Sequence, residues 1–255
     1  MVYELTETDR AAKLFEGWEE TIIYSCLQKV MGKLYAAEDS LGGKCLESAA
    51  ACLGDFMFFA GKPCKELVMR KPDGYVIMVP QTEEWASVIK DCFLGTARQI
   101  TRYAMRKDTV FHEERLKRMI KELPREYRLQ PIDEELYDQC IAYEWSRDLV
   151  SGFESKAAYM KYGLGVVITK NGEIVSGASS YSIYRDGIEI EVDTREDERR
   201  KSLAAVCCAE LILECLKRKL YPSWDAHTLW SVHLAEKLGY EFSHEYIAYE
   251  VVDYD

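Results

Sequence analysis

Long apolar runs are absent from this sequence. No stretch approaches the roughly 20 consecutive apolar residues that a membrane-spanning helix requires. Residues 1–10 are polar and acidic, unlike the basic and then apolar start of a secretory signal. We therefore expect a cytoplasmic protein that neither crosses nor binds a membrane.

Cysteine pairs with CxxC spacing are also absent, although the 255 residues include nine cysteines. Zinc sites and thiol redox centres commonly use such pairs, so both are poor interpretations of this chain and we expect no metal site. In a chain without a secretory leader, we interpret the nine cysteines as reduced thiols.

An excess of basic residues is the third absence. The chain has 33 Lys and Arg against 44 Asp and Glu, a formal net charge of −11. Phosphate contacts supply most of the affinity of nucleic-acid-binding proteins. Nucleic acid is thus excluded as the main partner, whereas the 48% apolar content is sufficient for a substantial core.

Residues 187–220 form the most informative stretch of the chain. Apolar and acidic residues alternate over 188–193, which predicts a strand. Residues 203–216 are apolar around most of a helical circumference, which predicts a helix buried against a sheet. Basic residues at 217–219 suit the negative end of that helix.

Between the predicted strand and helix lies a basic cluster, formed by Arg195, Arg199, Arg200 and Lys201. A helix N-terminus offers unpaired backbone N–H groups to an anion. Strand, basic turn and buried helix together predict a phosphate cradle. The alternative is a solvated charge run that pairs with the acidic residues at 196–198.

The cluster also carries a recognisable motif. Arg199, Arg200, Lys201, Ser202, Leu203 and Ala204 resemble motif A of the GNAT acyltransferases, Arg/Gln-x-x-Gly-x-Gly/Ala, with Ser202 in place of a glycine. Residues 221–242, YPSWDAHTLWSVHLAEKLGYEF, are similar to motif B. They resemble one branch in particular, that of the zwittermicin A resistance acetyltransferase.

The resemblance implies an α/β (α+β) protein of two halves. Residues 125–255 would form the GNAT acetyltransferase domain, with the element order β-α-α-β-β-β-α-β-α-β. Residues 1–124 would form a mixed α/β domain that is either a degenerate GNAT-like copy or an unrelated cap. No internal repeat is evident in the sequence.

Hydrophobic periodicity and turn residues predict the individual elements. In the N-terminal half we expect helices over 11–30, 82–105 and 111–123, and strands over 33–37, 45–51, 55–60, 66–69 and 75–79. In the C-terminal half we expect helices after Asp133 and over 155–162 and 229–238, and strands over 127–131, 165–169, 174–183 and 246–252. Turns are expected at Gly42-Gly43 and Asn171-Gly172.

The resemblance also implies acetyl-CoA as cosubstrate. The expected cofactor-binding residues are Val192, Asp193, Thr194, Arg199, Arg200, Lys201, Ser202, Leu203, Ala204, Ser231 and Leu234. The backbone of residues 192–194 would hold the pantetheine arm and polarise the thioester, and the N–H groups of 200–204 would bind the pyrophosphate. Ser202 suits this site if its φ is negative, whereas a positive φ would weaken binding.

Acetyl transfer needs an uncharged amine and therefore a base. Glu189 and Glu191 share one face of the predicted strand and are the expected catalytic residues, with ordinary outward-facing side chains as the alternative. Motif B usually supplies a Tyr as general acid and an Asn. Here those positions are Ala235 and Thr228, which puts a general acid in doubt.

We therefore expect an N-acetyltransferase that moves an acetyl group from acetyl-CoA to the amine of a small molecule by direct attack. The departures at Ser202, Thr228 and Ala235 motivate an alternative, a sensor or regulatory module that binds acyl-CoA without efficient turnover. A protein-interaction scaffold without a cofactor is a further alternative. The sequence leaves open whether the chain is a monomer or a homodimer.

Overall fold

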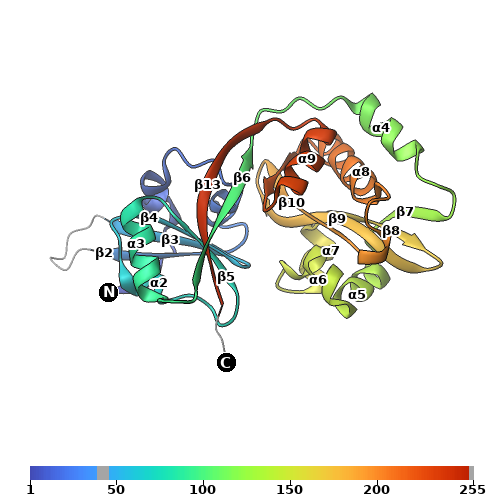
Figure 1. Ribbon diagram of the computed structural model, residues 1–255. Coiled ribbons are helices and arrows are strands. Elements are labelled where there is room, and N and C mark those ends of the chain that lie inside the picture. Colours follow the sequence, from blue (N-terminus) through green and yellow to red (C-terminus); the bar gives the residue numbers. More distant parts are fainter. Residues whose placement is uncertain (39–45, 253–255) are drawn as a thin grey trace. The chain divides into compact units, whose positions relative to one another are not determined.

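The computed structural model describes residues 1–38 and 46–252 (Figure 1). The chain forms two compact units, residues 1–102 with 245–255 and residues 103–244. The expected Gly42-Gly43 turn lies outside the described residues. The division into domains at residue 124 stays a prediction, although 103–124 belong to the same compact unit as 125–244.

The unit of residues 103–244 contains a five-stranded sheet in the order β11-β10-β9-β8-β7. Its strands are β7 (Tyr127–Pro131), β8 (Gly165–Lys170), β9 (Glu173–Tyr184), β10 (Gly187–Thr194) and β11 (Tyr221–Ser223). Pairing is antiparallel from β7 to β10 and parallel between β10 and β11. The expected turn between β8 and β9 is present, with positive φ at Asn171 and Gly172.

Helices cover both faces of this sheet (Figure 1). One face carries α8 (Leu203–Lys217), and the other carries α5 (Glu134–Ala142), α6 (Glu144–Ser151) and α7 (Lys156–Tyr162). The same unit contains α4 (Glu113–Lys121), the short η2 (Glu196–Glu198), β12 (Asp225–Ala226) and α9 (Leu229–Leu238). Nine residues of α8 are buried, which confirms the helix expected to pack against a sheet.

The other unit contains β1 (Val2–Glu4), η1 (Thr8–Phe15), α1 (Thr21–Leu27), β2 (Lys33–Glu38), β3 (Leu46–Leu53), β4 (Phe56–Gly61), α2 (Lys65–Val68), β5 (Val76–Pro80) and α3 (Glu83–Cys92). The chain continues through β6 (Ala97–Met105) and ends in β13 (Phe242–Val251). In the sheet, β13 pairs with β5. Trp85, fully buried on α3, stacks on Phe59 and anchors the core.

The two units share one topology. In the order β1-β2-β3-β4-β5, pairing is antiparallel up to β4 and parallel between β4 and β5, as it is along β7 to β11. Helix α2 occupies the place of α8 but has 4 residues where α8 has 15. This shared topology favours the alternative in which the first half is a degenerate copy of the second.

Three predicted elements of the N-terminal half are wrong. The helix expected over 11–30 is split by Gly17, which has a φ of +85°, into η1 and α1. Residues 65–68 form a helical turn rather than a strand. The helix expected over 82–105 stops at Cys92, because Gly95 has a φ of +84° and the β-branched and aromatic residues after it form β6. Its start is confirmed, since Thr82 Oγ1 accepts from Trp85 N.

The helices of residues 1–38 and 46–252 bear on whether the chain could span a membrane. None of them combines the length and the apolar character that crossing a bilayer requires.

The packing of α4 generates a test of the core. Leu116 on α4 is fully buried within the cluster that includes α8. We expect Leu116→Ala to lower the free energy of unfolding by about 2–5 kcal/mol, because truncation leaves a cavity. Leu229, 56% exposed, is the control, and Leu229→Ala should stay within about 0.5 kcal/mol of wild type. Urea unfolding followed by circular dichroism measures both, and equal losses would contradict the packing.

Candidate active site

The expected strand, turn and helix are present in sequence order. Strand β10 ends at Thr194, the 3-10 turn η2 follows, and α8 begins at Leu203. Ser202 is the N-cap residue, and its side chain makes no capping hydrogen bond. The first N–H groups of an α-helix have no partner within the helix. They are therefore available to a ligand at this end of α8.

The turn has two residues in the left-handed region. Arg200 and Ser202 both have a φ of +63°. This conformation costs an L-residue roughly 1–2 kcal/mol of conformational free energy, whereas glycine adopts it without that cost. This explains why the related motif carries glycine at the position of Ser202. The condition under which we expected Ser202 to weaken cofactor binding, a positive φ, is thus met.

Several of the basic side chains are already engaged. Arg195 Nε donates to Asp197 at 2.7 Å and Arg195 Nη1 to Glu173 at 3.0 Å. Arg199 Nε donates to the carbonyl of Thr194 at 3.2 Å. The alternative of internal ion pairing therefore describes Arg195 well. Arg200 is exposed and makes no ion pair among the described residues.

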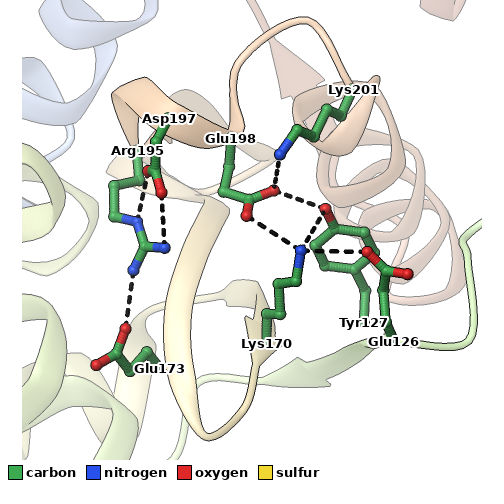
Figure 2. Close-up of polar contacts among 8 residues, drawn as sticks. All are labelled: Glu126, Tyr127, Lys170, Glu173, Arg195, Asp197, Glu198 and Lys201. Carbon is green, nitrogen blue, oxygen red and sulfur yellow. Dashed lines mark hydrogen bonds and ion pairs between the residues drawn. The ribbon is translucent and has the colours of Figure 1, made fainter.

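Glu198 is the hub of the turn (Figure 2). Its side chain is 6% exposed and accepts from Tyr127 Oη at 2.6 Å, Lys201 Nζ at 2.7 Å and Lys170 Nζ at 3.3 Å. Lys170 also pairs with Glu126 at 3.1 Å. The bonds from Lys201, Tyr127 and Lys170 lower the pKa of Glu198 to about 2. Sequence reasoning missed this residue, because it read 196–198 as neutralising charge.

The ladder between β10 and β11 is short. It consists of Gly187↔Tyr221, Ile188↔Pro222 and Glu189↔Ser223. After Ser223 the chain enters β12, which pairs with β6 instead, at Asp225↔Ala104. The edge of β10 at residues 190–194 therefore has no β11 partner. This gap is where the resemblance places a pantetheine arm.

A backbone donor on this segment of β10 is already occupied. The backbone N–H of Val192 donates to Glu191 Oε1 at 3.0 Å. Val192 lies among the residues whose backbone we expected to polarise the thioester. Glu189, the other predicted base, is buried at 6% exposure, while Glu191 is half-buried.

The surroundings of Asp193 shift its pKa toward neutral pH. Burial and, to a lesser degree, the nearby carboxylate of Asp148 on α6 raise the pKa of Asp193 to about 7, and Arg199 opposes this. A general base is most effective when its pKa lies near the working pH. Sequence reasoning considered only the backbone of Asp193, because the burial that shifts its pKa depends on α6.

The motif B residues lie on and before α9. Thr228 Oγ1 accepts from Ser231 N at 3.3 Å and caps the helix, and Ser231 Oγ accepts from Trp224 Nε1 at 3.1 Å. Ala235 is fully buried and Leu234 is half-buried. Thr228, at the position where motif B usually has Asn, is thus the N-cap of α9.

Two tyrosines that are candidates for a general acid donate to backbone carbonyls instead. Tyr240 Oη donates to the carbonyl of Pro222 at 2.6 Å, and Tyr221 Oη donates to that of Arg106 at 2.9 Å. Burial raises the pKa of Tyr240 well above its usual value. Both tyrosines are thus engaged in packing and in hydrogen bonds to the backbone.

Lys237 is a further residue of the site that sequence reasoning missed. Its Nζ donates to Ser202 Oγ at 3.4 Å. Ser231, Leu234 and Lys237 follow a spacing of three along α9, so their side chains lie along one side of the helix. Extending the predicted pair by one step would have identified Lys237. In residues 1–38 and 46–252, no group of three His, Cys, Asp or Glu side chains is placed to hold a metal ion.

Comparison with known proteins agrees with this geometry. The sequence profile described as GNAT acetyltransferase matches residues 12–249. The "Uncharacterized N-acetyltransferase YdfB" of Bacillus subtilis (strain 168) is 27% identical over 175 residues, which are 66% of this chain and 63% of that protein. The match thus spans less than two thirds of that relative.

Solved structures give the same result. A GCN5-related N-acetyltransferase-like protein from Streptococcus suis 89/1591 is 46% identical, with a TM-score of 0.89 over 96% of this chain and 98% of that one. A GCN5-related N-acetyltransferase from Sphaerobacter thermophilus is 13% identical, with a TM-score of 0.61 over 99% and 95%. At this lower identity the likeness shows the fold alone.

The family profile covers most of the chain, including β10, α8 and α9. The expected fold class, a mixed α/β protein with a GNAT acetyltransferase fold, is confirmed, and so is the expected enzyme class. The chain belongs to the GNAT acetyltransferase family.

Proposed function

We propose that this protein transfers the acetyl group of acetyl-CoA to the amine of a small molecule by direct attack. One observation carries the proposal: the uncovered edge of β10 leads directly into the turn that precedes α8. An extended thioester can lie along the strand while its diphosphate meets the N–H groups at the helix start. Direct attack needs no nucleophile from the protein.

Cysteine nucleophiles are disfavoured by their surroundings. Cys207 and Cys208, on α8, are fully buried. Burial raises the pKa of the Cys207 thiol to about 12, and the thiolate is the nucleophilic form. A direct transfer, in which the amine attacks the thioester carbonyl and the CoA thiolate leaves, therefore fits the described residues better than a covalent intermediate.

We assign the base to Asp193. In the proposed reaction its carboxylate takes a proton from the substrate ammonium, and the free amine then attacks. Asp148 contributes a second negative charge, so an ammonium group would be attracted to this side of β10. The sequence-based assignment to Glu189 and Glu191 stays a prediction, which the same experiments test.

The alternative function is an acyl-CoA sensor with little turnover. Three observations favour it: the strained Ser202, the buried Ala235 at the usual acid position, and the occupied N–H of Val192. The relation to the zwittermicin A resistance branch, a cytoplasmic location and a monomeric or homodimeric state also stay proposals.

A coenzyme-release assay with a panel of amines and amino sugars tests the proposal. Release of CoA that depends on an amine supports N-acetyl transfer. Calorimetric binding of acetyl-CoA without turnover on any amine would support the sensor instead. An absence of both binding and turnover would overturn both readings and favour a scaffold without a cofactor.

The raised pKa of Asp193 predicts the pH dependence of the reaction. We expect kcat/KM to rise with pH through about 7 as Asp193 loses its proton. Asp193→Asn should lower kcat by about 10²–10⁴ and remove this inflection, because general base catalysis contributes about that much. Asp148→Asn is the matched variant. It removes the neighbouring charge, so the inflection should move to lower pH.

Unfolding of the Asp193 variant gives an independent check with a defined sign. A carboxyl group whose pKa is raised by folding binds more protons in the folded state, so its contribution to stability falls as pH rises from about 4 to about 7. Asp193→Asn should therefore gain stability relative to wild type above pH 7. If the inflection persists in Asp193→Asn and Glu189→Gln or Glu191→Gln abolishes it, the base is one of those glutamates.

The strained backbone of Ser202 predicts opposite effects of two substitutions. Ser202→Gly should raise the free energy of unfolding by about 0.5–1 kcal/mol, since glycine adopts a positive φ without strain. Ser202→Val should lower it by more, because β-branched residues are outliers in this region. Urea unfolding measures both. Destabilisation by glycine would show that the turn does not need the left-handed conformation.

A further inference from the structure

A cavity of about 510 Å³ lies beside the C-terminal half of α8. It is bounded by the end of β7, the end of α7, the start of β8 and one side of α8, all within the unit of residues 103–244. Small-molecule sites commonly have volumes of about 300–1,000 Å³, so this space can hold a ligand. Its lining residues, among those that the structure describes, include none from β10 or from the turn before α8. The cavity is therefore separate from the candidate active site.

Much of the cavity wall is apolar and fixed by the fold. Leu164, Val166 and Leu211 line the cavity and also belong to the core cluster that joins the sheet to α8. Leu129 lines it from β7 and packs against the same cluster. Because packing in the core holds these side chains in place, they offer a preformed surface to an apolar group.

The polar side of the cavity lies on α8. Glu210, Glu214 and Arg218 all line it, and their spacing of four residues places them along one side of the helix. Glu214 accepts from Arg218 Nε at 2.6 Å and from Lys217 Nζ at 3.3 Å. The charge of Glu214 is therefore compensated within the protein.

Glu210 has no such compensation. Within residues 1–38 and 46–252 its carboxylate forms no hydrogen bond and no ion pair, although the residue is half-buried. Burial and then the charge of Glu214 raise the pKa of Glu210, and Lys217 opposes this. Removing a carboxylate from water is costly unless a cation or a hydrogen-bond donor compensates for it. This side of the cavity therefore favours a ligand that brings a cation.

A second polar group without a partner lies under the floor of the cavity. Tyr159, on α7, is 2% exposed and lines the cavity, and its Oη forms no hydrogen bond among the described residues. A Cβ at Gly165 would collide with this Oη and would lie 2.7 Å from Ile132 Cδ1. Gly165 and Ile132 both line the cavity. Buried hydroxyls are nearly always paired, and this one would gain a partner from a polar ligand atom that enters beside Ile132.

We propose that this cavity binds a small primary amine that has an apolar body and a second polar group. The ammonium group pairs with the carboxylate of Glu210. The body lies against Leu129 and Leu164, and the second polar group forms a hydrogen bond with the hydroxyl of Tyr159. Each of these contacts uses a group that the fold has already placed at the cavity.

The cations of the lining argue against an anionic ligand. Arg218 is paired with Glu214, and Lys161 Nζ lies over the ring of Tyr162, 4.7 Å from its centroid. Both cations are thus engaged, whereas Glu210 is not, so charge favours an ammonium group over a carboxylate or a phosphate. The inference does not depend on acetyl transfer, because the cavity uses no residue of the candidate active site.

Calorimetry with phenethylamine tests the site, with 2-phenylethanol and 3-phenylpropionate as neutral and anionic analogues. We expect wild type to bind phenethylamine about tenfold more tightly than either analogue, because hydrogen bonds between charged groups are stronger than neutral ones. Glu210→Gln should remove this preference. Glu236→Gln, which removes an exposed carboxylate of α9 outside the cavity, is the matched control and should bind as wild type does. No binding of phenethylamine, or tighter binding of the anion, would overturn the proposal.

The proposed acetyl acceptor is also an amine, so a second variant must separate the two sites. Binding of phenethylamine that is retained in Asp193→Asn and weakened in Glu210→Gln assigns the amine to the cavity. The reverse pattern would assign it to the candidate active site and would contradict the proposal.

Tyr159→Phe tests the buried hydroxyl. Without a ligand this variant should have a higher Tm than wild type, because it removes a buried polar atom that has no partner. Tyramine, which adds a hydroxyl group to phenethylamine, should bind wild type more tightly than phenethylamine does, and this advantage should disappear in Tyr159→Phe. A lower Tm, or an unchanged advantage of tyramine, would show that the hydroxyl serves the fold and not the ligand.

Discussion

The carboxylate of Glu198 is the interaction on which the candidate site depends. A charge at 6% exposure is costly unless hydrogen bonds compensate for it, and here donors arrive from β7, from β8 and from the turn itself. These three bonds tie the turn to two strands at once. The turn can therefore hold Arg200 and Ser202 at a positive φ, a conformation that side chains normally resist.

The same ion pairs bear on the proposed binding of phosphate. Lys201 forms an ion pair with Glu198, and Arg195 forms ion pairs with Asp197 and Glu173. These cations therefore stabilise the conformation of the turn more than they attract an anion. In the proposed function, backbone N–H groups would then carry most of the phosphate recognition, with help from the exposed Arg200. A site of this kind would select an anion by geometry, which suits a chain with a net charge of −11.

The sequence predicted best where signals are local. Local patterns predicted strand β10 from its alternation, helix α8 from its apolar circumference and the start of α3 from Thr82. Each of these signals depends only on neighbours in the chain. Glu198 and the pKa of Asp193 depend on Tyr127, Lys170 and Asp148, which lie far away in sequence. The sequence did not predict the repeated topology either. The first unit keeps the strand order, but its helix after β4 has only 4 residues.

The early departure of β11 leaves the backbone groups of β10 beyond Glu189 without a β11 partner. A bare strand edge of this kind can pair with the edge of another molecule and seed aggregation, and charged side chains are a common protection. Glu191 and Asp193 stand on this segment, so two copies that approached edge to edge would bring carboxylates together. Repulsion between such carboxylates would oppose edge-to-edge pairing of two copies at this strand.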